Sequence, residues 1–122
     1  MTPLAVYLPS LLFTLAVELP LLIVLLRGRA PASRAVLAGV LGTGVMHPLL
    51  WYAWPQLFSD YWAYIVSGEL LVLVVEAVVI QVIARPGAAR ALAASGVANA
   101  ASYLGGALLK ASGVWESVLG AS

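Results

Sequence analysis

Long apolar runs separated by three short polar breaks dominate the chain. Each run is long enough to cross about 30 Å of hydrocarbon as an α-helix, which takes about 20 residues. The runs cover approximately residues 4–26, 35–54, 61–84 and 91–109. This pattern predicts an all-α integral membrane protein with a single domain of four transmembrane helices. Residues 111–122 are too few to span and are expected to form a short outer tail or interfacial helix.

Composition supports the same class of protein. Of the 122 residues, 63% are hydrophobic and 9% are charged, whereas a soluble domain carries about 25% charged residues. The first apolar run lacks a basic leader and is longer than the core of a signal peptide, so we expect it to remain as a helix. The sequence has no basic cluster of the kind that binds nucleic acids. Because Cys is absent, disulfides, zinc–thiolate sites and thiol nucleophiles are excluded.

The arginines predict an orientation. All five lie in the first and third breaks, at residues 27–34 and 85–90, whereas the second break, at residues 55–60, has no basic residue. The positive-inside rule places the arginine breaks in the cytoplasm and both termini outside the cell (inner) membrane. The tryptophans then lie near the outer surface, as an interfacial aromatic belt would. They are Trp51, Trp54, Trp62 and Trp115.

The two halves of the chain resemble each other weakly. Glu18 precedes Arg27 at the spacing by which Glu76 precedes Arg85. Thr43 likewise follows Arg34 at the same spacing at which Asn99 follows Arg90. The pattern is consistent with a tandem repeat of one helical hairpin, with both copies oriented in parallel. Chance similarity between alanine- and valine-rich helices is the alternative.

Each predicted helix carries one narrow polar stripe, because polar residues recur at steps of three, four or seven. The stripes contain Thr14 and Glu18, then Thr43 and His47, then Glu69 and Glu76, then Asn99 and Ser102. Four such stripes are most stable when all face inward, toward one another or a water-filled cavity. We therefore expect these side chains to converge.

The depth of each polar residue follows from the helical rise of about 1.5 Å per residue. Glu18, Glu76 and Asn99 each lie about 13 Å from an arginine break, near the bilayer midplane. His47 and Ser102 lie about one turn further out, and Glu69 lies outward of Asn99 by about two turns. Toward the cytoplasm only Ser95 and Gln81 continue the stripe.

Carboxyl groups at the bilayer centre cost about 2.5–3.5 kcal/mol each on insertion scales, and they are usually functional. The leading hypothesis is a mid-membrane site that binds or transports a proton or another cation. Its candidate residues are Glu18, Glu76, His47, Glu69, Asn99, Ser102 and Thr14.

Three further hypotheses stay open. Glu18, His47, Glu69 and Glu76 could bind a divalent metal ion, since carboxylates with an imidazole suit transition metals. The chain could instead be an accessory subunit of a larger membrane complex. An intramembrane enzyme using Glu and His as acid and base ranks lower, because no motif marks a nucleophile. A chain this short has little room to enclose a pathway, so we expect a homodimer or a larger complex.

Overall fold

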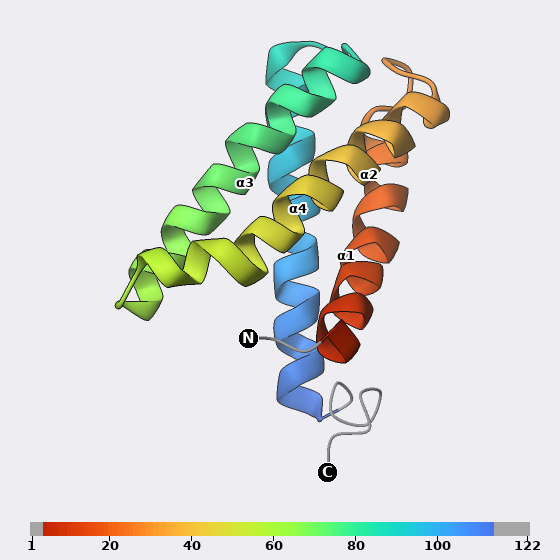
Figure 1. The fold of residues 1–122 in the computed structure, drawn as a ribbon. Helices are drawn as coiled ribbons and strands as arrows, with labels where there is room; N and C mark the ends of the chain where they lie inside the picture. Colours follow the sequence, from red (N-terminus) through yellow and green to blue (C-terminus); the bar gives the residue numbers. More distant parts are fainter. Residues whose placement is uncertain (1–3, 114–122) are drawn as a thin grey trace.

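The computed structural model describes residues 4–113, and this part of the chain is helical throughout, apart from its short connections (Figure 1). Four of its helical spans are long and apolar enough to cross a membrane. The elements are α1 (Leu4–Leu25), α2 (Ala32–Pro48), η1 (Leu49–Ala53), η2 (Trp54–Leu57), α3 (Tyr61–Ile83) and α4 (Ala88–Ser112). Trp115 and most of the predicted tail at residues 111–122 lie outside the described residues.

The second helix differs from the sequence prediction of one continuous helix over residues 35–54. Its α-helical part ends at Pro48 and continues as a π-helical turn and then a 3-10 turn. Proline has no backbone N–H, so the carbonyl of Gly44 loses its helical donor. The backbone then forms the hydrogen bonds of a π-helix, which join residues five apart. The Trp54 N–H accordingly donates to the Leu49 carbonyl. The fourth helix also extends beyond its predicted range of 91–109 at both ends.

The helices form a ring in which each packs against two others: α1 on α2, α2 on α3, α3 on α4 and α4 on α1. They lie close together at the end that carries the α1–α2 and α3–α4 connections. Toward the opposite end α2 and α3 lean away from α1 and α4, which gives the bundle the outline of a V (Figure 1). The fold is therefore closed at one end and splayed at the other.

An apolar core fills the closed end. Its buried members are Leu22, Leu26, Ala35, Ala38, Ile80, Ala84, Ala91, Ala94 and Ala98. Small residues on α2 and α4 let the helices approach closely. The approach is tightest at Gly39, where an added Cβ would come within 2.9 Å of Leu22 Cδ1.

Arginine side chains hold the helix ends together at the closed end. Arg34, at the start of α2, donates to the Ile83 carbonyl at 2.9 Å, and Arg90, at the start of α4, donates to the Leu25 carbonyl at 3.1 Å. Both carbonyls belong to the last turn of a helix, where carbonyls lack a helical donor and a positive charge is favourable. The first bond ties α2 to α3 and the second ties α4 to α1.

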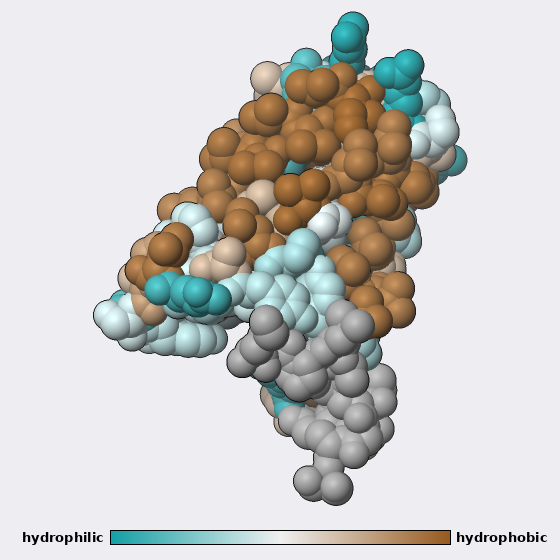
Figure 2. Space-filling view, viewed as in Figure 1, coloured by the Kyte–Doolittle hydropathy of each residue, from teal (hydrophilic) through white to brown (hydrophobic). Residues whose placement is uncertain are grey.

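The outer surface suits a lipid environment. Figure 2 shows apolar side chains over the helix bodies, with hydrophilic residues gathered toward the ends of the bundle. Large apolar side chains such as Leu12, Val24, Val82 and Leu108 are each more than half exposed. Contiguous exposed apolar surface of this extent is rare on soluble monomers, so the pattern agrees with four membrane-spanning helices.

Candidate functional site

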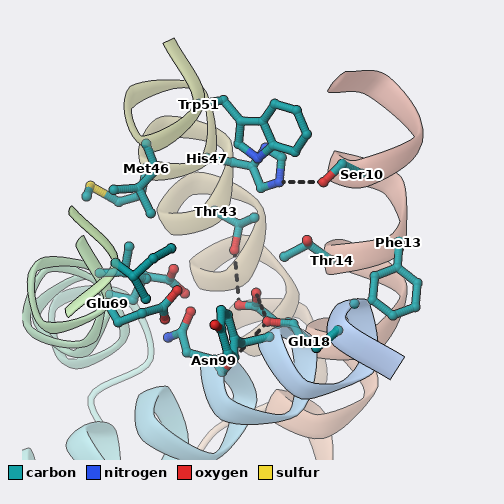
Figure 3. Close-up of a pocket in the computed structure, with 18 of the residues that line it drawn as sticks. Ser10, Phe13, Thr14, Glu18, Thr43, Met46, His47, Trp51, Glu69 and Asn99 are labelled. Carbon is teal, nitrogen blue, oxygen red and sulfur yellow. Dashed lines mark hydrogen bonds between the residues drawn. The ribbon is translucent and has the colours of Figure 1, made fainter. Parts of the chain in front are cut away.

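A cavity of about 370 Å³ lies between the four helices and extends into the open end of the V. All seven candidate residues from the polar stripes line it (Figure 3). They are Thr14, Glu18, His47, Glu69, Glu76, Asn99 and Ser102. Tyr61 and Lys110 line the cavity near the ends of α3 and α4, so it reaches from the middle of the bundle to the splayed end.

Glu18 and Glu76 form the deepest part of the site. They are 1% and 4% exposed, and their carboxyl groups lie close enough together to interact directly. An ionised carboxylate can only accept hydrogen bonds. The two groups can therefore bond each other only when at least one of them carries a proton. Two adjacent carboxyl groups with one shared proton also avoid the repulsion of two negative charges.

Two hydroxyl groups complete the surroundings of Glu18. Thr43 Oγ1 donates to Glu18 Oε1 at 3.2 Å, and Ser102 Oγ donates to Oε2 at 3.3 Å (Figure 3). Ser102 Oγ also lies 3.1 Å from the Asn99 carbonyl. A hydroxyl has a single proton to donate and can also accept. Ser102 can thus donate to an ionised Glu18, or accept from a protonated Glu18 while it donates to the carbonyl.

Asn99 connects the pair to the closed end. Its side chain lies beside the Glu76 carboxyl group, and its Nδ2 donates to the Ser95 carbonyl at 2.8 Å. Ser95 Oγ in turn donates to the Leu73 carbonyl, and Gln81 accepts a hydrogen bond from the Gly87 N–H. The two residues that continue the polar stripe toward the arginine breaks therefore tie the backbone together, and the cavity stops short of them.

His47 lies on the α1 side of the cavity and is not paired with Glu69. Its Nε2 is 3.4 Å from Ser10 Oγ, and its ring stacks on Trp51 with centroids 5.6 Å apart (Figure 3). Tyr7 packs against the same imidazole. The Nδ1 atom is buried and has no hydrogen-bond partner in the described part of the chain.

The Ser10–His47 contact resembles the start of a nucleophile–base pair, but the third member is missing. A catalytic histidine needs a group on its other nitrogen to hold the tautomer that accepts the serine proton. Within residues 4–113 nothing bonds Nδ1 of His47. The contact therefore gives no support to an intramembrane hydrolase.

The residues of the metal hypothesis do not form a coordination shell. No three His, Asp or Glu side chains in the described residues lie close enough together to hold a metal ion. A zinc site usually has three or four protein ligands. Glu18, His47, Glu69 and Glu76 line one cavity, but no three of them meet.

Several lining residues are not apparent from the polar stripes. Phe13, Met46, Trp51, Tyr64 and Tyr103 surround the polar groups. Phe13 lies one residue from Thr14, and Tyr103 lies beside Ser102. Their proximity to the stripes is the only signal in the sequence, since aromatic residues also serve membrane interfaces and helix packing.

Together these features define an all-helical protein whose four helices can span a membrane and which holds a buried carboxyl pair at the inner end of a one-sided cavity. Comparison of the chain with protein-family models, curated proteins and solved structures found no match. Its function is therefore inferred from its own residues.

Proposed function

We propose that this protein is integral to the cell membrane and transports protons, or exchanges a proton for another cation, at the Glu18–Glu76 pair. The observation that carries the proposal is the close approach of two buried carboxyl groups at the inner end of a cavity. Such a pair holds a proton that a cation entering the cavity can displace. The hydroxyl of Ser102 stabilises Glu18 in either protonation state.

Energetics favour a functional pair over simple helix attachment. Interhelical polar bonds in one membrane protein average about 0.6 kcal/mol. A single mid-membrane carboxyl group costs about 2.5–3.5 kcal/mol. The two hydroxyl bonds to Glu18, together with a bond between the carboxyl groups, would offset only part of the cost of two such groups. Serine or threonine at both positions would tie the helices together at lower cost.

The arginine distribution supports cytoplasmic α1–α2 and α3–α4 connections with both termini outside. In this orientation the cavity opens to the outside, and the apolar core closes it toward the cytoplasm. Because Arg34 ties α2 to α3 and Arg90 ties α4 to α1, each tied pair can move as one body. Rocking of the two bodies about the carboxyl pair would open the cytoplasmic end, as in transporters with alternating access.

Burial supports a tandem repeat of one helical hairpin. Leu22 and Leu26 follow Glu18 at the spacing by which Ile80 and Ala84 follow Glu76, and all six are buried. In the second helices, buried Ala35, Ala38, Gly42 and Thr43 correspond at one fixed spacing to Ala91, Ala94, Ala98 and Asn99. The reciprocal arginine bonds follow the same correspondence.

The test is proton flux into liposomes that contain the purified protein and a trapped pH-sensitive dye. We expect Glu18→Gln and Glu76→Gln each to lower the flux by about tenfold or more, because an amide preserves shape but cannot carry the proton. Asp60→Asn is the matched control. Asp60 caps α3 through the Ala63 N–H outside the cavity, and Asn caps equally well. Wild-type flux in both Gln variants would refute the proposal.

An accessory subunit is the second candidate, since several polar side chains only join backbone segments. Ser95 bonds the Leu73 carbonyl and Tyr64 bonds the Leu50 carbonyl. On this alternative the pair also attaches helices, and the wild-type protein alone gives no flux above protein-free liposomes. Its mass in detergent, measured by light scattering, distinguishes a monomer from the homodimer that we propose for so short a chain.

A further inference from the structure

The cavity is larger than proton binding requires. Its volume of about 370 Å³ could hold roughly 12 water molecules at about 30 Å³ each. It also falls within the range of small-molecule pockets, about 300–1,000 Å³. Among the described residues, three acidic side chains line it, and Lys110 is the only lysine or arginine that does. The volume and the charge together suit a positively charged small molecule.

Glu69 is the acidic group that a ligand would meet first. It lines the cavity about two helical turns from Glu76 toward the open end, and it is partly buried. The carboxyl pair and its hydroxyl partners bond one another, whereas no hydrogen bond within residues 4–113 reaches the Glu69 carboxyl group. A partly buried carboxyl group without a protein partner is available to pair with a cation.

Aromatic side chains line the same cavity. Trp51 lines it from η1, Tyr64 from α3, Phe13 from α1 and Tyr103 from α4. The negative face of an aromatic ring attracts a cation within about 6 Å, and such rings recognise substituted ammonium groups. The same rings offer apolar surface to a hydrocarbon body. A bare metal ion would use neither property, and the described residues hold no metal-ligand cluster.

The geometry points to the cavity as a binding site for a small organic cation, whose ammonium group pairs with Glu69 and whose apolar body contacts the surrounding aromatic side chains. This inference rests on the proposed function, because the organic cation would be the species exchanged for the proton of the Glu18–Glu76 pair. Lys110 lies near the end of α4 and is exposed.

The test is isothermal titration calorimetry of the full chain in a nonionic detergent. The probe is benzyltrimethylammonium, which has a permanent charge, and benzyl alcohol is a neutral probe that carries the same benzyl group. We expect saturable binding of the cation and none of the alcohol above the protein-free micelle blank. Glu69→Gln should weaken cation binding by about tenfold or more through loss of the charge pair, whereas Asp60→Asn, which removes an acid outside the cavity, should not change it.

A matched pair of variants tests the aromatic wall. Tyr103 is 42% exposed and lines the cavity. Tyr103→Phe keeps a ring and should bind the probe as the wild type does, whereas Tyr103→Leu should weaken binding by about two- to fivefold. Equal binding of the cation and the alcohol, or unchanged cation binding in Glu69→Gln, would overturn the inference.

Proton flux separates this inference from the proposal on which it rests. Flux that depends on Glu18 and Glu76, in a protein that does not bind benzyltrimethylammonium, would refute the organic-cation site alone. Binding that depends on Glu69, in a protein without proton flux, would refute proton transport while leaving the binding site established.

Discussion

A single methyl group added at Gly42 would contact the carboxyl pair. A Cβ added there would lie 3.2 Å from Cγ and 3.7 Å from Cδ of Glu76. Carbon atoms in good contact are about 3.5–4.0 Å apart, so in Gly42→Ala the Glu76 side chain must move by a few tenths of an ångström. The hydrogen bonds to Glu18 from Thr43 and Ser102 are already 3.2 and 3.3 Å long, beyond the usual O–H···O range of about 2.5–3.0 Å. A displaced Glu76 should therefore break at least one bond at the pair.

The expected magnitude separates stability from function. Gly→Ala within a helix gains about 0.5–1 kcal/mol, whereas added volume in a packed interior costs about 1–3 kcal/mol. Gly42→Ala should thus lose at most about 2.5 kcal/mol of unfolding free energy. A hydrogen bond to a charged group contributes about 1.5 kcal/mol or more, equivalent to roughly a tenfold change. We expect the proton flux to fall by about that factor.

Gly44→Ala is the matched control for this prediction. The position lies on the same helix two residues away, is exposed, and has no atom within 4 Å of an added Cβ. This variant should keep wild-type flux and melt at the same or a slightly higher temperature. Liposome flux and thermal unfolding in detergent measure both properties. Equal flux in the two alanine variants would refute the idea that transport depends on the placement of Glu76 against Gly42.

Three further predictions follow from individual contacts. Ser102→Ala should lower proton flux by several fold with little change in melting temperature, because it removes the hydroxyl that bonds Glu18; unchanged flux would contradict its role. Arg34→Ala and Arg90→Ala should lower the melting temperature by similar amounts, since each removes one bond to the end of a helix, and a large difference would weaken the proposed repeat. The chain has no cysteine, so single cysteines can report the orientation. Ser59→Cys should react with an impermeant maleimide in intact cells, and Ser33→Cys should react only after permeabilisation. The reverse pattern would mean that the proposed orientation is inverted.

The arrangement of the polar core was predictable because helical geometry and membrane energetics act together on few residues. Steps of three and four place Asn99 and Ser102 on one face, and the cost of lipid exposure turns that face inward. The rise per residue puts Glu18 and Glu76 at one depth. In the structure the two carboxyl groups adjoin each other, and Ser102 donates to Glu18. The rule succeeds here because a buried acid has few acceptable positions.

Features that depend on packing between helices were not predictable in the same way. The sequence places His47 near the level of Glu69, but rotation of α2 directs the imidazole toward Ser10 and Trp51. Pro48 marks a break in the backbone, yet only the structure reveals that a π-helical turn follows. The described residues also contain no metal-ligand cluster. Whether ligands on different helices meet depends on the distances between those helices, and the spacing of residues along one helix does not determine these distances.

On the proposed repeat, the two hairpins correspond closely at the closed end and differ at the open end. Glu18 corresponds to Glu76, and Thr43 corresponds to Asn99, so the carboxyl pair belongs to the part that both halves share. His47 instead corresponds to Tyr103, and Glu69 corresponds to Leu11. Beyond Pro48 the second helix unwinds, whereas α4 continues as an α-helix. Groups present once per chain thus line the wider part of the cavity.

A symmetric pair suits a proton carrier that must face both sides of a membrane, and the asymmetric groups suit recognition of a ligand that enters from one side. Changes at Glu69 should for this reason alter ligand binding without abolishing proton binding at the pair.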